Sequence, residues 1–222
     1  MKKFVIAGTG AVASELTMYI NNHNSLSDKN DRIEIKGYID WKMNAEKNFS
    51  KYKFNAPLIA DFNSFEQNSD EEVLLGFANI GFKKQIVSEF KSRNIIFGSF
   101  VHHSVIIPTG TFLGEGNIIY PFCIIGANVT IGSWNLITSF SFVSHDCKIG
   151  NYNFFSTSGI AGGVSIGDSN FFGIRTTVIP NISIGNNNTI QAGMILDKNI
   201  GHDETVFFRF KEKVIAIPGN NP

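Results

Sequence analysis

The adjacent pair His145 and Asp146 has the side chains of a general base and its charged partner. Imidazole titrates near neutral pH, so His145 suits the removal of a proton from an amine or hydroxyl that attacks a carbonyl. Asp146 would hold the ring in one tautomer and stabilise the imidazolium that forms. No serine stands beside His145 in a nucleophile arrangement, and Cys123 and Cys147 fall at positions that we expect to point inward. We therefore predict direct base-catalysed transfer of a group, without a covalent intermediate.

A glycine-rich turn near the N-terminus is the second candidate site. Residues 8–13, Gly-Thr-Gly-Ala-Val-Ala, match the phosphate-binding fingerprint with Gly8 and Gly10 as its glycines, between a predicted strand and a predicted helix. A complete dinucleotide site needs two βαβαβ halves, and this segment has room for about one. We therefore expect a single nucleotide, or the nucleotide part of a sugar nucleotide, rather than a nicotinamide cofactor.

The elements around this turn follow a βαβ order. Predicted strands lie at 3–7, 33–40 and 72–77, predicted helices at 13–20 and 83–91, and polar connections at 23–31 and 42–52. Ligands of such folds bind at the carboxyl ends of the strands. Asp40 ends the second strand and is a candidate to accept a hydrogen bond from a base or ribose, with an exposed turn carboxylate as the alternative.

A different period begins at residue 101, where Val, Ile, Leu or Phe recurs at almost every sixth position. These residues are Val101, Ile107, Leu113, Ile119, Ile125, Ile131, Ile137, Val143, Ile149 and Phe155, then Ile160, Ile166, Phe172, Val178, Ile184, Ile190 and Leu196. The repeat after Phe155 is one residue short. A period of six fits neither an amphipathic helix nor a half-buried strand, but it fits a left-handed parallel β-helix in which three hexads close one triangular coil.

Asparagines recur at the fifth position of the hexad, one coil apart: Asn117, Asn135, Asn153, Asn170 and Asn188. A buried amide without hydrogen-bond partners is costly, so we expect these side chains to bond to one another along one inner edge. The predicted role of this ladder is structural.

The two periods predict two domains, a small Rossmann-like α/β domain at 1–97 and a left-handed parallel β-helix at 98–200, followed by a tail at 201–222. The formal net charge is zero, which gives no general attraction for nucleic acid or an anionic membrane. No apolar run is long enough to span a bilayer, and residues 1–3 lead directly into a strand rather than a signal peptide. We expect a cytoplasmic protein.

The order of these parts, together with the segment Val-Ser-His-Asp-Cys-Lys-Ile-Gly at 143–150, resembles the hexapeptide-repeat sugar acetyltransferases. That family includes enzymes that N-acetylate amino sugars on nucleotide carriers and sialic-acid O-acetyltransferases. The resemblance covers nearly the whole chain. It implies transfer of an acetyl group from acetyl-CoA to a nucleotide-linked 4-amino or 3-amino deoxysugar, with His145 as the base and Asp146 as its partner, in the synthesis of a surface polysaccharide or glycan.

The resemblance also implies an assembly and a set of binding residues. Members of the family are homotrimers that hold acetyl-CoA between adjacent β-helices, and no metal is expected. By this resemblance the pantetheine arm would lie near Gly162, Ile174 and Ala192, and Gly8, Gly10 and Asp40 would face the nucleotide. Arg209, Lys211 and Lys213 could attract the CoA phosphates, with a solvated charge run as the alternative.

Two residues depart from the family pattern. Many members have a second histidine nine residues after the base and another in the glycine turn, where this chain has Phe154 and Val12. The short repeat after Phe155 and the absence of the usual Gly-x-Pro-Ala ending are further differences. Phe154 and Phe171 precede inward residues, so we expect them at corners or outward, in a subunit interface.

The sequence is compatible with three other functions. A sugar O-acetyltransferase would use the same base on a hydroxyl acceptor. A catalytically impaired trimeric scaffold would explain Phe154. A β-helical carbonic anhydrase would need several histidines around one zinc, whereas the repeats contain only His102, His103 and His145.

Overall fold

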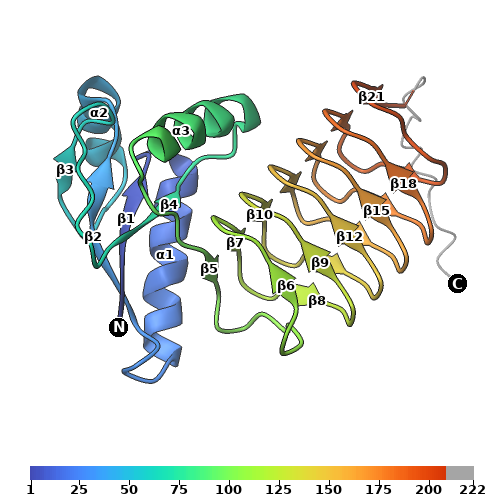
Figure 1. Cartoon of the computed structure of the whole chain (residues 1–222), viewed down its shortest axis with the longest axis horizontal. Helices are drawn as coiled ribbons and strands as arrows, with labels where there is room; N and C mark the ends of the chain where they lie inside the picture. The colour runs from blue at the N-terminus through green and yellow to red at the C-terminus, as the bar shows by residue number, and fades with distance from the viewer. Residues whose placement is uncertain (209–222) are drawn as a thin grey trace, which may run out of the picture.

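The computed structural model describes residues 1–208, which form an α/β region followed by a triangular stack of parallel strands (Figure 1). Four parallel strands of the α/β region are ordered β3-β2-β1-β4. Its elements are β1 (Lys2–Ala7), α1 (Ala11–Leu26), β2 (Ile33–Ile39), α2 (Lys42–Lys51), β3 (Leu58–Ala60), β4 (Glu72–Leu75) and α3 (Ile80–Ser92). The central strand β1 ends in four fully buried residues, as expected for a parallel sheet covered on both faces.

Two segments that we predicted as polar connections are partly or wholly helical, so these two predictions are wrong in part. Residues 42–51 form the helix α2, and α1 continues through the start of the 23–31 connection to Leu26. Ala45 is the single buried residue of α2, so this helix has no apolar stripe that a sequence pattern could detect. The three-residue edge strand β3 was not predicted either, because none of its residues is buried.

The second half of the chain is a parallel β-helix with three faces of two-residue strands. Face 1 contains β5 (Phe100–Val101), β7 (Ile118–Ile119), β10 (Leu136–Ile137), β13 (Phe154–Phe155), β16 (Phe171–Phe172), β19 (Thr189–Ile190) and β21 (Thr205–Val206). Face 2 contains β8 (Ile124–Ile125), β11 (Phe142–Val143), β14 (Gly159–Ile160), β17 (Thr177–Val178) and β20 (Ile195–Leu196). Face 3 contains β6 (Phe112–Leu113), β9 (Thr130–Ile131), β12 (Lys148–Ile149), β15 (Ser165–Ile166) and β18 (Ser183–Ile184).

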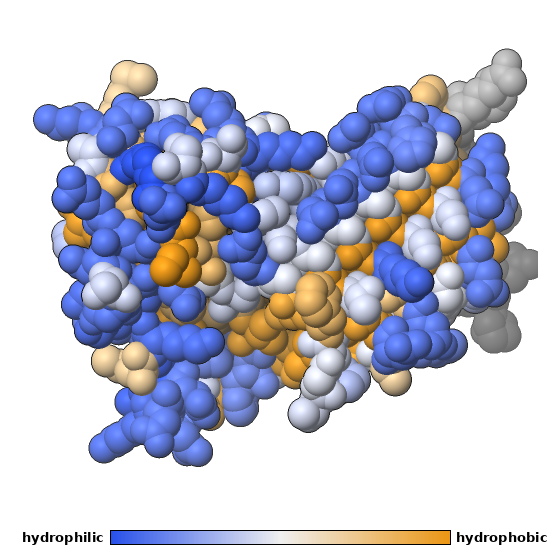
Figure 2. Space-filling view, in the orientation of Figure 1, coloured by the Kyte–Doolittle hydropathy of each residue, from blue (hydrophilic) through white to orange (hydrophobic). Residues whose placement is uncertain are grey.

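These strands confirm the predicted hexapeptide repeat. The second residue of nearly every strand points into the stack and forms one apolar core. Bands of hydrophobic residues run along the stack from coil to coil on the side turned to the viewer in Figure 2. We call the turn from face 1 to face 2 the first corner, that from face 2 to face 3 the second corner, and that from face 3 to face 1 the third corner.

The short repeat changes the first corner. Only the three residues 156–158 separate β13 from β14, whereas four residues, 138–141, separate β10 from β11 one coil earlier. Thr157 turns this short corner with a φ of 46°, in the left-handed region. The strands nevertheless pair in register above and below it, Phe155 with Ile137 and with Phe172.

The predicted asparagine ladder runs up the third corner. The Asn135 amide donates to Asn117 Oδ1 at 3.0 Å, and the Asn153 backbone N–H donates to Asn135 Oδ1 at 2.8 Å. Asn170 and Asn188 continue the chain of bonds, each amide donating to the preceding asparagine at 3.0 Å. All five side chains are buried and serve as the corner's hydrogen-bond partners.

The α/β region packs directly on the first coils of the β-helix, and α1 lies between the four-stranded sheet and face 1 (Figure 1). Leu16 and Ile20 of α1 share a buried cluster with three outward residues of face 1, Phe100, Ile118 and Leu136. Burial of these residues on both sides fixes the position of α1 against the repeats.

A buried lysine forms a second contact between the two parts. Lys83 of α3 is 2% exposed, and its Nζ donates to the backbone oxygen of Trp134 at 3.1 Å. Burial lowers the pKa of Lys83 to about 7. The unfolded chain therefore binds a proton that the folded chain has released between pH 7 and the ordinary lysine value of 10.5. The free energy of unfolding should rise with pH across that window.

Replacing Lys83 with methionine is expected to raise the free energy of unfolding at pH 7 by a few kcal/mol, at about 1.4 kcal/mol per pKa unit. Urea denaturation between pH 6 and pH 10 measures the effect, and the difference between wild type and Lys83→Met should shrink as the pH rises. The exposed neighbour Lys84, changed to methionine, serves as the control. A difference that stays constant with pH would contradict the lowered pKa of Lys83.

Candidate functional site

His145 and Asp146 lie at the second corner, between β11 and β12. Asp146 turns the corner with a φ of 60°, a conformation that Asp tolerates better than most residues. Its Oδ2 lies 2.7 Å from Nδ1 of His145, and both side chains are more than half exposed. A ring that donates from Nδ1 to a carboxylate leaves the lone pair of Nε2 free to accept a proton.

Asn128 completes this corner one coil below. Its amide donates to Asp146 Oδ1 at 2.7 Å, and this bond, followed by the one from His145, lowers the pKa of the Asp146 carboxyl. Both carboxylate oxygens are thereby occupied, and the carboxylate stays charged beside the ring. Sequence reasoning did not identify Asn128, although its position 18 residues before Asp146 places it in the same corner of the preceding coil.

The ring of His145 lies over the backbone of Gly162. A Cβ at Gly162 would stand 2.7 Å from Cε1 and 2.8 Å from Nε2 of the imidazole. Of the three residues predicted to contact the cofactor, Gly162 is therefore adjacent to the candidate base.

Replacing Gly162 with alanine should displace this ring. Because His145 is exposed, its side chain can swing outward without disturbing the core, so the fold should stay intact. The expected result is a loss of about 10²-fold in kcat for the transfer proposed below, because small displacements of a reacting group cost that much. Gly81→Ala in α3 is the matched control, and an unchanged kcat in Gly162→Ala would show that the ring position is unimportant.

Ile174 and Ala192 lie at the first corner, not the second. Gly193 donates a backbone hydrogen bond to Ile174 at 2.8 Å, and a Cβ at Gly173 would meet the backbone N of Ala192 at 2.5 Å. The two residues therefore stack on successive coils, one corner away from Gly162. A single chain does not bring the three predicted cofactor residues together.

Gly8, Gly10 and Asp40 all line a cavity of about 330 Å³ at the carboxyl ends of the strands. Gly8 has a φ of 100°, a backbone conformation that would be strained in any residue with a side chain. Gly10 begins α1 without a side-chain cap, so the first N–H groups of the helix are available to an anion. Trp41 and Asn44 at the start of α2 form part of the same wall.

Asp40 is 6% exposed, so the alternative of an exposed turn carboxylate is wrong. Its Oδ2 accepts from the backbone N–H of Thr9 at 2.9 Å and from the Thr9 hydroxyl at 2.6 Å. Its Oδ1 accepts from the backbone N–H of Trp41 at 2.8 Å. Asp40 thus ties the end of β2 to the glycine turn and sets the shape of the cavity.

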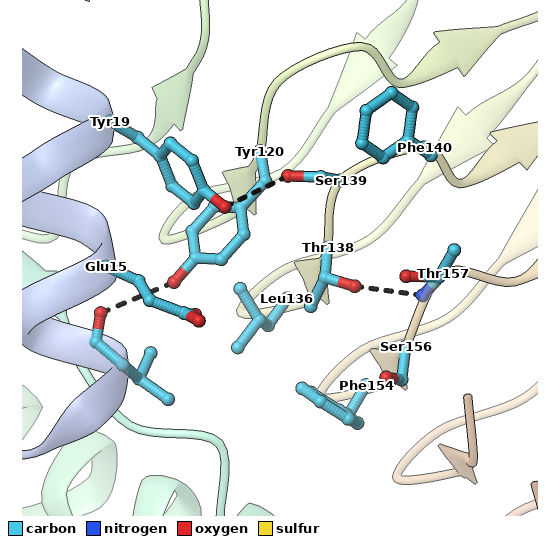
Figure 3. A pocket seen from close by; sticks show the side chains of 11 residues that line it. Glu15, Tyr19, Tyr120, Leu136, Thr138, Ser139, Phe140, Phe154, Ser156 and Thr157 are labelled. Atoms are coloured by element: carbon cyan, nitrogen blue, oxygen red, sulfur yellow. Dashed lines mark hydrogen bonds between the residues drawn. The ribbon is translucent and has the colours of Figure 1, made fainter. Parts of the chain in front are cut away.

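A second cavity of about 300 Å³ lies between α1 and the first corner (Figure 3). Val12 belongs to the walls of both cavities. Phe154 and the short corner residues Ser156 and Thr157 line the second one. Val12 and Phe154, the two residues that depart from the pattern of the resembled family, therefore line one cavity together with the short repeat. Phe154 points outward from face 1, as predicted, and there it packs against the cluster around α1.

The remaining candidate residues have structural contacts. Cys123 and Cys147 are buried, and desolvation raises the pKa of both thiols, that of Cys123 to about 11. His102 bonds to Asn22, and burial lowers its pKa to about 4. Arg209, Lys211 and Lys213 lie outside the described residues. Within residues 1–208, no group of three His, Cys, Asp or Glu side chains is placed to hold a metal ion.

None of the helices in residues 1–208 combines the length and the apolar character needed to cross a bilayer.

The sequence matches no family profile and no curated protein. Solved structures do match. The acetyltransferase domain of PglB from Neisseria gonorrhoeae is 15% identical with a TM-score of 0.75, over 92% of this chain and 96% of that one. WeeI from Acinetobacter baumannii is 19% identical with a TM-score of 0.75, over 92% and 96%.

PerB from Caulobacter crescentus, solved in complex with CoA and GDP-perosamine, is 19% identical with a TM-score of 0.75, over 92% of this chain and 93% of that one. These similarities cover both the α/β region and the repeats. They confirm the predicted fold class, a small Rossmann-like α/β region followed by a left-handed parallel β-helix.

Proposed function

We propose that this protein is an acetyl-CoA-dependent N-acetyltransferase that acts on a nucleotide-linked 4-amino or 3-amino deoxysugar in surface glycan synthesis. The exposed His145–Asp146 pair over Gly162 is the observation that carries this proposal, because it presents a free ring nitrogen beside a charged partner. The fold shared with PglB, WeeI and PerB supports it, and the PerB structure contains CoA and GDP-perosamine.

In the proposed reaction the sugar nitrogen attacks the thioester carbonyl. Nε2 of His145 takes a proton from the nitrogen as the N–C bond forms, and the imidazolium returns it to the sulfur as the C–S bond breaks. Asp146, held by Asn128, stabilises the imidazolium between these two steps. The buried, high-pKa thiols of Cys123 and Cys147 favour this direct route over a covalent acyl-enzyme.

The nucleotide belongs, in this proposal, to the cavity of Gly8 and Gly10, where the N-terminus of α1 receives its phosphates. Asp40 acts as a positioning residue through Thr9 rather than as a direct ligand. Residues 1–97 thus bind the nucleotide and residues 98–200 carry the transfer.

We further propose a homotrimer with acetyl-CoA between adjacent β-helices. Gly162 lies at one corner and Ile174 and Ala192 at another, so a second copy is required to enclose one cofactor between them. Face 2 supports this assembly because its outward residues Ile124 and Phe142 are 48% and 45% exposed. Light scattering tests the assembly by asking whether the particle has the mass of three chains.

Free-thiol release from acetyl-CoA tests the reaction. The purified protein is offered nucleotide-linked 4-amino and 3-amino deoxysugars, and the same sugars with a hydroxyl in place of the amine. Release that requires the amine supports N-acetylation, whereas release with the hydroxyl sugars alone would assign O-acetylation. No release with any acceptor, together with no acetyl-CoA binding by calorimetry, would favour the scaffold.

A further inference from the structure

Glu15 is the only charged residue in the lining of the cavity between α1 and the first corner, as residues 1–208 define it. It projects from α1 toward the cavity in Figure 3. The residue as a whole is exposed, and partial burial of its carboxyl raises the pKa of that group, to which no side chain or backbone group of residues 1–208 donates a hydrogen bond. The acceptor capacity of this carboxylate is therefore available to a ligand that donates hydrogen bonds.

The rest of the lining divides into a polar and an apolar part. Thr138, Ser139 and Ser156 present hydroxyl groups; that of Thr138 accepts from the Thr157 N–H at 2.9 Å, and that of Ser139 lies 3.4 Å from the Tyr19 hydroxyl. The apolar part is formed by Val12, Leu136 and Phe154. A sugar ring matches both parts of this lining, because it has apolar C–H groups on its faces and hydrogen-bond donors at its edge.

The position of the cavity favours the same occupant. Val12 separates it from the cavity of the glycine turn and lines both. A ligand whose phosphates meet the first turn of α1 has only to pass Val12 to place a sugar beside Glu15. The carboxylate stands in the same cavity as Val12 and Phe154, the two residues that depart from the pattern of the resembled family.

We propose that Glu15 is a specificity residue for the acceptor, whose ring lies in this cavity and donates a hydrogen bond from a hydroxyl or ammonium group to the Glu15 carboxylate. This inference rests on the proposed function for the identity of the ligand, a nucleotide-linked amino sugar. It assigns no proton transfer to Glu15.

Calorimetry without acetyl-CoA tests the assignment. The probes are UDP- and GDP-linked 4-amino deoxysugars, with UDP and GDP as controls that lack the ring. Glu15→Ala should raise the Kd of the sugar nucleotide by at least about 10-fold, the effect of losing a hydrogen bond to a charged group. The Kd of the parent nucleoside diphosphate should not change. Glu15→Gln should lose less, and Glu66→Ala, at an exposed loop residue, should bind like the wild type.

Two results overturn the inference: Glu15→Ala weakens sugar nucleotide and nucleoside diphosphate equally or not at all, or the wild type binds none of the sugar nucleotides more tightly than UDP or GDP. Thiol release is measured separately. Glu15-dependent binding without acetyl transfer would keep this inference and remove the proposed reaction. Acetyl transfer combined with binding that does not depend on Glu15 would remove this inference and keep the proposed reaction.

Discussion

Replacing His145 with alanine is expected to lower kcat/KM for acetyl transfer by about 10²- to 10⁴-fold, the usual contribution of a positioned general base. Both acetyl-CoA and the nucleotide should still bind, because the side chain is 66% exposed and no core contact depends on it. Thiol release with the best acceptor of the panel measures the rate, and calorimetry measures the two affinities.

Two further variants separate the base from its partner. Asp146→Asn removes the charge beside the ring, so its kcat should lie between those of the wild type and His145→Ala. His202→Ala changes another exposed histidine, outside the proposed site, and should leave the rate unchanged. A His145→Ala protein with the wild-type rate would remove the base from the mechanism.

Replacing Asn153 with alanine is expected to cost about 3–5 kcal/mol of the free energy of unfolding, because each buried polar group left unpaired costs about 1–3 kcal/mol. Asn153 Oδ1 accepts from the backbone and the side chain of Asn170 at 2.9 and 3.0 Å. Its amide donates to the backbone oxygen of Gly167 at 2.9 Å. The truncation leaves all three of these partners without their bonds and also opens a void in the third corner.

Urea denaturation at one fixed protein concentration measures this loss, because an oligomer's stability depends on concentration. Asn63→Ala, at an exposed residue of the α/β region, is the control and should change the free energy of unfolding by less than about 0.5 kcal/mol. A loss below about 1 kcal/mol in Asn153→Ala would mean that water or neighbouring residues replace the missing bonds.

The contrast between α2 and the asparagine ladder explains what was predictable. The ladder follows from two facts that a sequence records, a fixed period and the cost of burying an amide. The helix α2 has one buried residue, Ala45, and therefore carries no pattern that marks its inner side. The contact between Asp40 and Thr9 was missed for a related reason: the two residues are 31 positions apart and meet only once β1 and β2 pair.

The sequence by itself determined the β-helix, its inward residues, the short repeat, the glycine turn and the exposed His145–Asp146 pair. These features are local or periodic, so the chemistry of each residue and its spacing are enough. Only the tertiary structure decided that Val12, Phe154 and Thr157 line one cavity with Glu15, and that Gly162 lies at a different corner from Ile174 and Ala192. Those relations depend on how α1 packs on face 1 and on which corner each repeat reaches, and a one-dimensional pattern does not record either.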